Sequence, residues 1–135
     1  MPFAWNDDVK IRYRTEGAGT PLVMHHGLSG YAESWITAGY FEPLTEHKLI
    51  LLDARGHGQS SKPDTSEQYS MKHMTGDVVA VLDKLNIDKT LYCARAMISF
   101  FSRGNEAIVE EMEKESGARA MYWLNLKELL SKKWD

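Results

Sequence analysis

Two short apolar runs in the first half of the chain each end in a glycine-rich loop. Residues 21–24 lead into the loop 25–30, and residues 48–52 lead into the loop 53–60. Apolar runs of this length, bounded by glycine, predict buried strands that end in tight turns. Because open α/β sheets bind ligands at the carboxyl ends of their strands, the two loops predict the edge of the sheet that carries a site.

Alternation and turn residues predict three further elements around these strands. Residues 3–5 and 9–14 flank an Asn-Asp-Asp turn and predict a β-hairpin, whose second arm alternates apolar and basic positions. Such alternation is typical of a strand covered on one face. Residues 31–39 predict a short helix, and residues 90–93 predict a short core strand, the fifth overall.

The clearest helix follows Ser70, a favourable N-cap residue, and ends near Asn86. Its apolar residues repeat with the spacing of one buried stripe. These residues are Met71, Met74, Val78, Val81, Leu82 and Leu85.

After Ala94 the pattern changes to amphipathic helices without a further strand signal. The last of these predicted helices contains Ala120, Trp123, Leu124, Leu130 and Trp134. We therefore predict one domain, in which residues 1–94 form the α/β core and residues 95–135 form a helical segment.

Composition excludes several classes of protein. The chain has 135 residues and a formal net charge of −3, which gives no basic surface for nucleic acid. Cys93 is the only cysteine, so an intramolecular disulfide is impossible and a reducing compartment is expected. Residues 1–8 lack the features of a signal peptide, and no apolar run approaches the roughly 20 residues of a membrane span. We expect a cytoplasmic protein with no membrane partner.

The order of these motifs resembles the α/β-hydrolase fold superfamily. The elements that carry the resemblance are the hairpin, a strand ending in His25-His26-Gly27, and a strand leading into Asp-Ala-Arg-Gly-His-Gly-Gln-Ser at residues 53–60. The helix that begins with Tyr-Ser-Met fits the same family, and the match covers about two-thirds of the chain. The resemblance implies an α/β fold with a partial sheet of about five strands, a hairpin followed by parallel strands. It also implies flanking helices, and the two or three helices that the pattern predicts at the C-terminus are similar to a cap region.

The resemblance further implies acyl transfer through a serine, an acid and a histidine, with an oxyanion hole. In such enzymes the residue after the His-Gly turn supplies one oxyanion N–H, which is Leu28 in this chain. The oxyanion side of the predicted site therefore consists of His26, Gly27 and Leu28. No cofactor or metal is implied.

The sequence departs from the family where the nucleophile elbow, Gly-x-Ser-x-Gly, should follow the fifth strand. Residues 94–98 read Ala-Arg-Ala-Met-Ile, so Ala96 stands where the serine belongs. No strand ending in an acid and no late Gly-His pair follows. The C-terminal part of the fold therefore looks truncated or rearranged. A fragment, a truncated gene product and a natural short form all fit this pattern.

Several residues allow a structural or a chemical interpretation. His25 and His26 fit a packed sheet and a shaped turn better than catalysis or metal binding. Asp53 and His57 lie four residues apart and are expected to hold their glycine loop rather than form a charge relay. Cys93 is a weak candidate nucleophile, because a thiol inside an apolar strand is commonly a small buried hydrophobe.

Two functional hypotheses remain. The first is a carboxylic-ester hydrolase with an ester- or lactone-type small-molecule pocket that uses an unusual nucleophile or groups from a second chain. The second is a non-catalytic homologue with a structural or binding role. We also predict a homodimer, because residues 90–93 would form an exposed sheet edge with neither proline nor charge to block pairing.

Overall fold

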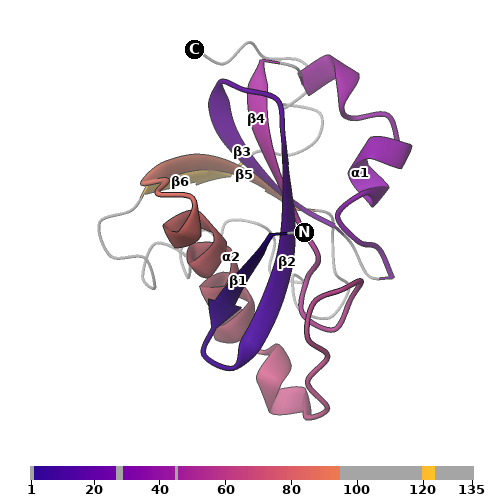
Figure 1. The fold of residues 1–135 in the computed structure, drawn as a ribbon, viewed down its shortest axis with the longest axis vertical. Helices are drawn as coiled ribbons and strands as arrows, with labels where there is room; N and C mark the ends of the chain where they lie inside the picture. The colour runs from indigo at the N-terminus through magenta and orange to yellow at the C-terminus, as the bar shows by residue number, and fades with distance from the viewer. Residues whose placement is uncertain (1, 27–28, 45, 95–119, 124–135) are drawn as a thin grey trace.

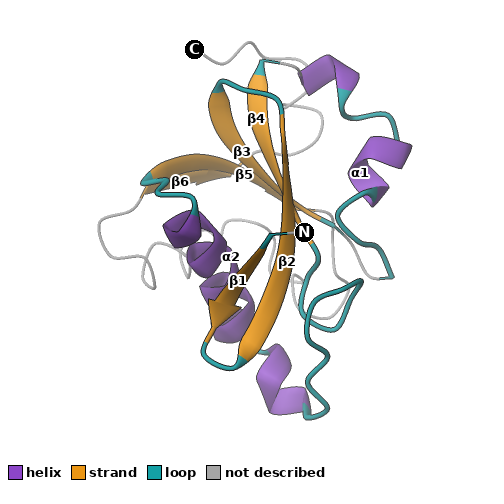
Figure 2. Cartoon of the chain, viewed as in Figure 1, coloured by secondary structure: helices purple, strands orange, loops and turns teal. Residues whose placement is uncertain are grey.

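The computed structural model describes residues 2–26, 29–44, 46–94 and 120–123, and the structural statements below concern these residues. They form one sheet of six strands in the order β1-β2-β4-β3-β5-β6 (Figure 1, Figure 2). The strands are β1 (Phe3–Asn6), β2 (Val9–Glu16), β3 (Thr20–His25), β4 (His47–Leu52), β5 (Lys89–Ala94) and β6 (Ala120–Trp123). The hairpin strand β2 pairs antiparallel with β1 and β4, whereas β3, β4, β5 and β6 run parallel.

Two α-helices and two 3-10 turns accompany the sheet in the described residues. They are α1 (Ser34–Thr37), the 3-10 turns η1 (Glu42–Leu44) and η2 (Ser66–Tyr69), and α2 (Met71–Lys84). The predicted cap of α2 is confirmed, because the Ser70 hydroxyl oxygen accepts a hydrogen bond from the His73 backbone N–H at 3.3 Å. The helix stops just before Asn86, which takes a left-handed conformation with φ of 56°.

Side chains of the parallel strands alternate between two separate apolar cores. In β4, Ile50 and Leu52 pack on the side of α2, whereas Leu49 and Leu51 pack on the side of α1 and Trp35. This division follows from the two-residue period of a strand. The stripe predicted for α2 is confirmed at Met74, Val78, Val81 and Leu82, which are all buried, while Leu85 is partly buried. These strands have continuous apolar sequences because the sheet is covered on both faces.

The hairpin forms as predicted, but its second arm departs at Arg12 from the pattern of a strand covered on one face. Asn6 pairs with Val9 across a turn in which Asp7 takes a φ of 53°. Arg12 lies on β2 with only 2% of its surface exposed. The sequence pattern does not reveal this burial, because the acidic partners of Arg12 come from distant segments of the chain.

The prediction that no strand follows Cys93 is wrong, as is the helix predicted through Ala120 and Trp123. Residues 120–123 form β6, which pairs parallel with β5 from Lys89↔Ala120 to Tyr92↔Trp123. A four-residue apolar run has no periodicity that separates a buried strand from a helix segment. The other residues of the predicted C-terminal helices lie outside the described part of the chain.

The prediction that β5 is the edge of the sheet is also wrong, because β5 pairs with β3 on one side and β6 on the other. A dimer through two copies of β5 would require β6 to leave. In the described part of the chain, the last strand on this side of the sheet is β6, whose sequence Ala-Met-Tyr-Trp again lacks proline and charge. Such an edge favours pairing with another chain.

The homodimer therefore stays a prediction, now with β6 as its edge. Light scattering after size exclusion at micromolar concentration should give twice the mass of 15.4 kDa. Replacing Tyr122 by proline should reduce this mass to that of a monomer, because proline cannot donate to a strand ladder. A monomer mass for the unaltered chain would contradict the prediction.

Candidate functional site

The two glycine loops lie together because β3 and β4 are parallel neighbours whose ends are in register, with His25 opposite Leu52. Hydrogen bonds join residues 53–60 to residues 25–32, which are the first loop and the two residues after it. His26 Nε2 accepts from the Ala54 backbone N–H at 2.9 Å, and the Asp53 Oδ1 atom accepts from the Ala32 N–H at 2.7 Å. The two loops at the predicted ligand-binding edge of the sheet are therefore bonded to each other.

Asp53 uses both carboxylate oxygens to hold the loops. Its Oδ2 atom accepts from the Gln59 backbone N–H at 2.9 Å, while Oδ1 bonds Ala32 in the other loop. Gly58 permits this closure, since a Cβ atom there would lie 2.3 Å from Oδ2, and its φ of +51° also disfavours a side chain. The expectation that Asp53 shapes its own loop agrees with these contacts, and Asp53 fixes the first loop as well.

Ser60 connects the second loop to the hairpin. Its hydroxyl donates to the Asp53 carbonyl oxygen at 2.6 Å and accepts from the Arg12 backbone N–H at 2.9 Å. Ser60 is buried, and its hydroxyl both donates and accepts a hydrogen bond within the protein. This role is structural, and it leaves the Ser60 hydroxyl engaged rather than available as a nucleophile.

An ion-pair network links β2 to the loop that follows β3. Arg12 binds Glu33 through two hydrogen bonds of 2.6 and 2.8 Å, and its Nη1 atom lies 3.5 Å from Asp53 Oδ1. Arg14 adds a contact of 3.3 Å to Glu33. Hydrogen bonding to Arg12 lowers the pKa of Glu33 to about 2 and raises the pKa of Arg12. Sequence reasoning missed this pair because no local pattern connects β2 to Glu33.

A second ion pair joins the 53–60 loop to α2. Arg55 Nε and Nη2 each lie 2.7 Å from an oxygen of Asp77, and Arg55 Nη1 donates to the Gln68 carbonyl oxygen at 2.5 Å. Both charged side chains are buried. Asn6 donates to the same Asp77 carboxylate at 2.9 Å, so the hairpin, the loop and the helix share one acceptor.

Three histidines gather where β3 and β4 end. The rings of His25 and His26 lie 6.1 Å apart, and those of His26 and His57 lie 4.9 Å apart. His25 Nδ1 is 2.6 Å from the hydroxyl of Tyr92 on β5. Burial, with a smaller effect of the neighbouring histidines, lowers the pKa of His25 to about 3, so this imidazole is neutral near pH 7.

The other predicted site residues are placed only in part. His26 lies in the loop contact described above, whereas Gly27, Leu28 and Ala96 lie outside the described residues. Cys93 belongs to β5, where its backbone is opposite Met24. Among the described residues, no group of histidine, cysteine and acidic side chains is arranged to hold a metal ion. None of the helices in the described ranges is long and apolar enough to cross a membrane.

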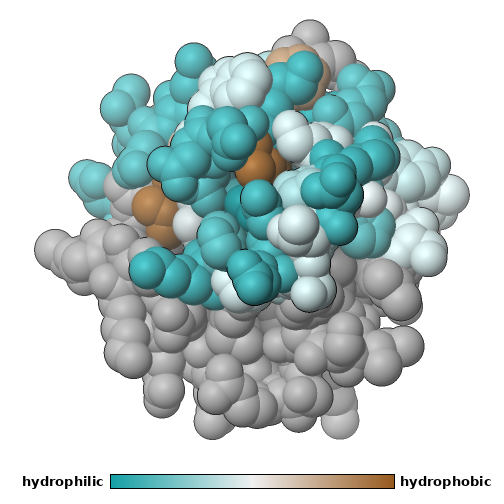
Figure 3. All heavy atoms as spheres, turned by 90° about the horizontal axis from the view of Figure 1, so that it is seen from below, coloured by the Kyte–Doolittle hydropathy of each residue, from teal (hydrophilic) through white to brown (hydrophobic). Residues whose placement is uncertain are grey.

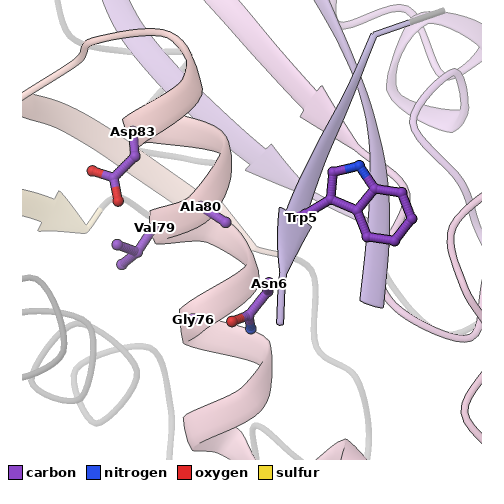
Figure 4. Close-up of a pocket in the computed structure, with 6 residues that line it drawn as sticks. All are labelled: Trp5, Asn6, Gly76, Val79, Ala80 and Asp83. Carbon is purple, nitrogen blue, oxygen red and sulfur yellow. The ribbon is translucent and has the colours of Figure 1, made fainter. Parts of the chain in front are cut away.

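A pocket of about 320 Å³ lies elsewhere, between β1 and α2 (Figure 4). Asn6 points toward Gly76 in this view, and Trp5, which is 62% exposed, points away from the helix. From below, the described surface is mostly hydrophilic, with only a few separate apolar spots (Figure 3). The pocket contains none of the histidines and is separate from the candidate site.

Comparison with known proteins agrees with this geometry. The sequence pattern of the alpha/beta hydrolase fold matches residues 20–94. A non-heme haloperoxidase from Rhodococcus erythropolis is 31% identical over 88 residues, which cover 64% of this chain and 31% of the relative. A bifunctional epoxide hydrolase from Mus musculus is 29% identical over 62% of this chain and 15% of its own length.

A solved structure described as an N-acyl homoserine lactone degrading enzyme has a TM-score of 0.73 and 31% identity. The similarity covers 93% of this chain and 44% of that one. The chain belongs to the α/β-hydrolase fold family. It spans less than half the length of these relatives.

Replacing Asp53 by asparagine should lower the free energy of unfolding by on the order of 3 kcal/mol, because it removes a buried charge that serves Arg12 and two amides. The asparagine NH₂ group would face one of these amides and could not accept from it. Urea denaturation measures the loss, with the exposed Asp64→Asn as the matched control. Equal stability of the two variants would contradict the role given to Asp53.

The protein should lose stability in acid as the Glu33 carboxylate becomes protonated. Its folded-state pKa of about 2 lies below the ordinary value of 4.5, so its contribution is complete above pH 4.5 and is lost as the pH falls toward 2. Urea denaturation at a series of pH values should therefore show a shallower acid loss in Glu33→Gln than in the unaltered chain. The exposed Glu42→Gln is the control, and identical pH curves for Glu33→Gln and the unaltered chain would refute the prediction.

Proposed function

We propose that the loops 25–32 and 53–60 form the oxyanion side of an ester- or lactone-hydrolysing site. The observation that carries this proposal is the Asp53 carboxylate, which binds Ala32 of one loop and Gln59 of the other. A hydrogen-bond donor stabilises a developing oxyanion only if it is already in place before the reaction. A buried carboxylate bonded to both loops supplies that fixed position.

The chemistry follows from family membership and from this position. Attack on an ester or lactone carbonyl produces a tetrahedral intermediate whose oxygen carries a negative charge. The Leu28 N–H, two residues after His26, is the donor that the family resemblance assigns to this oxygen. The ligand class is therefore a small molecule with an ester-like carbonyl, consistent with the lactone degradation described for one similar structure.

The nucleophile is the part of the reaction that this sequence does not provide in the usual way. No Gly-x-Ser-x-Gly occurs in the chain, and Ala96 replaces the serine at the expected position. This substitution favours a second candidate function, a homologue that binds carbonyl ligands without turnover. The alternative nucleophile Cys93 precedes the elbow position by three residues, and we expect only slow, unselective thiol reactivity from it. A cytoplasmic location is part of the same proposal.

The unaltered chain should not hydrolyse p-nitrophenyl acetate with saturable kinetics, because loss of a complete triad costs about a millionfold in turnover. A variant that restores a nucleophile tests the oxyanion side directly. In a Cys93→Ala background, Ala96→Cys places a thiol at the elbow position, and Lys84→Cys places one on the exposed end of α2 as the matched control. Mass spectrometry follows acetylation of each thiol by p-nitrophenyl acetate and its alkylation by iodoacetamide.

The ratio of acetylation rate to alkylation rate should be at least about tenfold higher for Ala96→Cys, since one oxyanion donor contributes about 10²–10³ in rate. Alkylation forms no oxyanion, so dividing by its rate removes differences in thiolate fraction and access. Equal ratios for the two thiols would overturn the proposed oxyanion side. The contrary result for the unaltered chain is saturable turnover that a single serine substitution abolishes. That result would overturn the inference that the chain lacks a nucleophile.

A further inference from the structure

The turn at Ser29 takes a conformation that serine rarely adopts. Its φ is 66°, in the left-handed region that favours glycine. A strained backbone of this kind persists only where the surrounding structure holds it. The hydrogen bond that the structure records for the Ser29 N–H is therefore informative, because it ties the turn to the loop 53–60.

That contact is His57 Nε2, which accepts a hydrogen bond from the Ser29 backbone N–H at 3.3 Å. The other ring nitrogen, Nδ1, lies 3.2 Å from the Arg55 carbonyl oxygen. Since a carbonyl only accepts, Nδ1 carries the proton and Nε2 is the lone-pair acceptor. Only the neutral imidazole in this tautomer makes both hydrogen bonds at once.

We propose that His57 is a positioning residue that holds the Ser29 turn while its imidazole is neutral and releases it on protonation. An imidazolium has N–H groups on both nitrogens and cannot accept from Ser29, so the hydrogen bond becomes a contact between two donors. Imidazole is the side chain that changes charge between about pH 5 and 8. The turn is thus held at higher pH and released as the pH falls.

The titratable and charged groups around His57 come from β3, from β2 and from its own loop. His26, at the end of β3, is the titratable ring that faces it at 4.9 Å, and His25 lies behind His26. A charge on His26 would repel one on His57, whereas burial lowers the pKa of His25 to about 3 and keeps it neutral over this range. The Asp53 carboxylate in the same loop is already bonded to Ala32 and Gln59, while Arg12 lies beside it at 3.5 Å. On the loop of His57 itself, Arg55 directs its charge to Asp77.

The consequence for chemistry rests on the proposed function, because Ser29 directly follows Leu28, the assigned oxyanion donor. The Ser29 turn itself can be tested without any hydrolysis. NMR of the full chain from pH 5 to 8 follows the Ser29 amide together with the ring protons of His57. We expect both to titrate with one midpoint, and the exchange of the Ser29 amide to rise about two- to tenfold on protonation, beyond the intrinsic pH effect.

Two variants at one position separate positioning from packing. In His57→Gln the amide oxygen can accept from Ser29 at every pH, so protection should remain and its pH dependence should vanish. In His57→Phe, which has no acceptor, protection should be low at every pH. His73→Gln, on the first turn of α2, is the control and should leave the Ser29 titration unchanged.

A Ser29 amide that does not titrate in the unaltered chain would overturn the proposal. So would a titration that persists in His57→Gln, which would assign the effect to His26. If His57→Phe fails to fold, the comparison between the unaltered chain and His57→Gln still decides. A negative result here leaves the acetylation ratio of Ala96→Cys untouched, so failure of the positioning role and failure of the oxyanion side are distinguishable.

Discussion

The buried carboxylate of Asp53 is the constraint on which the candidate site depends. Parallel pairing brings the ends of β3 and β4 together, but pairing ends at Leu52, and the loops beyond it have no strand ladder to fix them. Asp53, the next residue, replaces that ladder with bonds to Ala32 and Gln59. A charged acceptor bonded to backbone N–H groups gives shorter and stronger hydrogen bonds than a neutral one. Asp53 thus fixes both loops, together with the hydrogen bonds from Ala54 to His26 and from Ser29 to His57.

Burying that carboxylate is costly, and the surrounding charges show how the fold compensates for it. Arg12 approaches Asp53 and binds Glu33, while Arg55 and Asp77 form a second buried pair beside α2. Buried charges are tolerated when they are paired and their remaining donors and acceptors are bonded. The two pairs also connect the hairpin, both loops and α2. The part of the chain that the family pattern matches is thus cross-linked by charge as well as by its two apolar cores.

This construction separates the loops of the proposed oxyanion side from the position of the nucleophile. The framework depends on β3, β4 and the loops after them, all of which this chain retains. The nucleophile depends on the residues that follow β5, where Ala96 interrupts the usual motif. The proposed oxyanion side can therefore remain folded without a serine, because Asp53 binds Ala32 and Gln59 and lies beside Arg12, none of which belongs to the elbow. Family membership and catalytic competence are consequently separate properties of this protein.

The sequence by itself determined the elements with a strong local signal. The hairpin, the strands β3, β4 and β5, the capped helix α2 and the family all follow from periodicity, turn residues and the Asp-x-Arg-Gly-His-Gly-x-Ser run. Tertiary structure decided the rest. Residues 120–123 became a strand because β5 offered an open ladder, and a short apolar run has no intrinsic preference strong enough to oppose it. Arg12 became buried because Glu33 and Asp53 reach it from other segments, and the single contact from Ser29 to His57 exists only in the folded chain. Contacts between residues far apart in sequence leave no periodic signal, so only the folded structure reveals them.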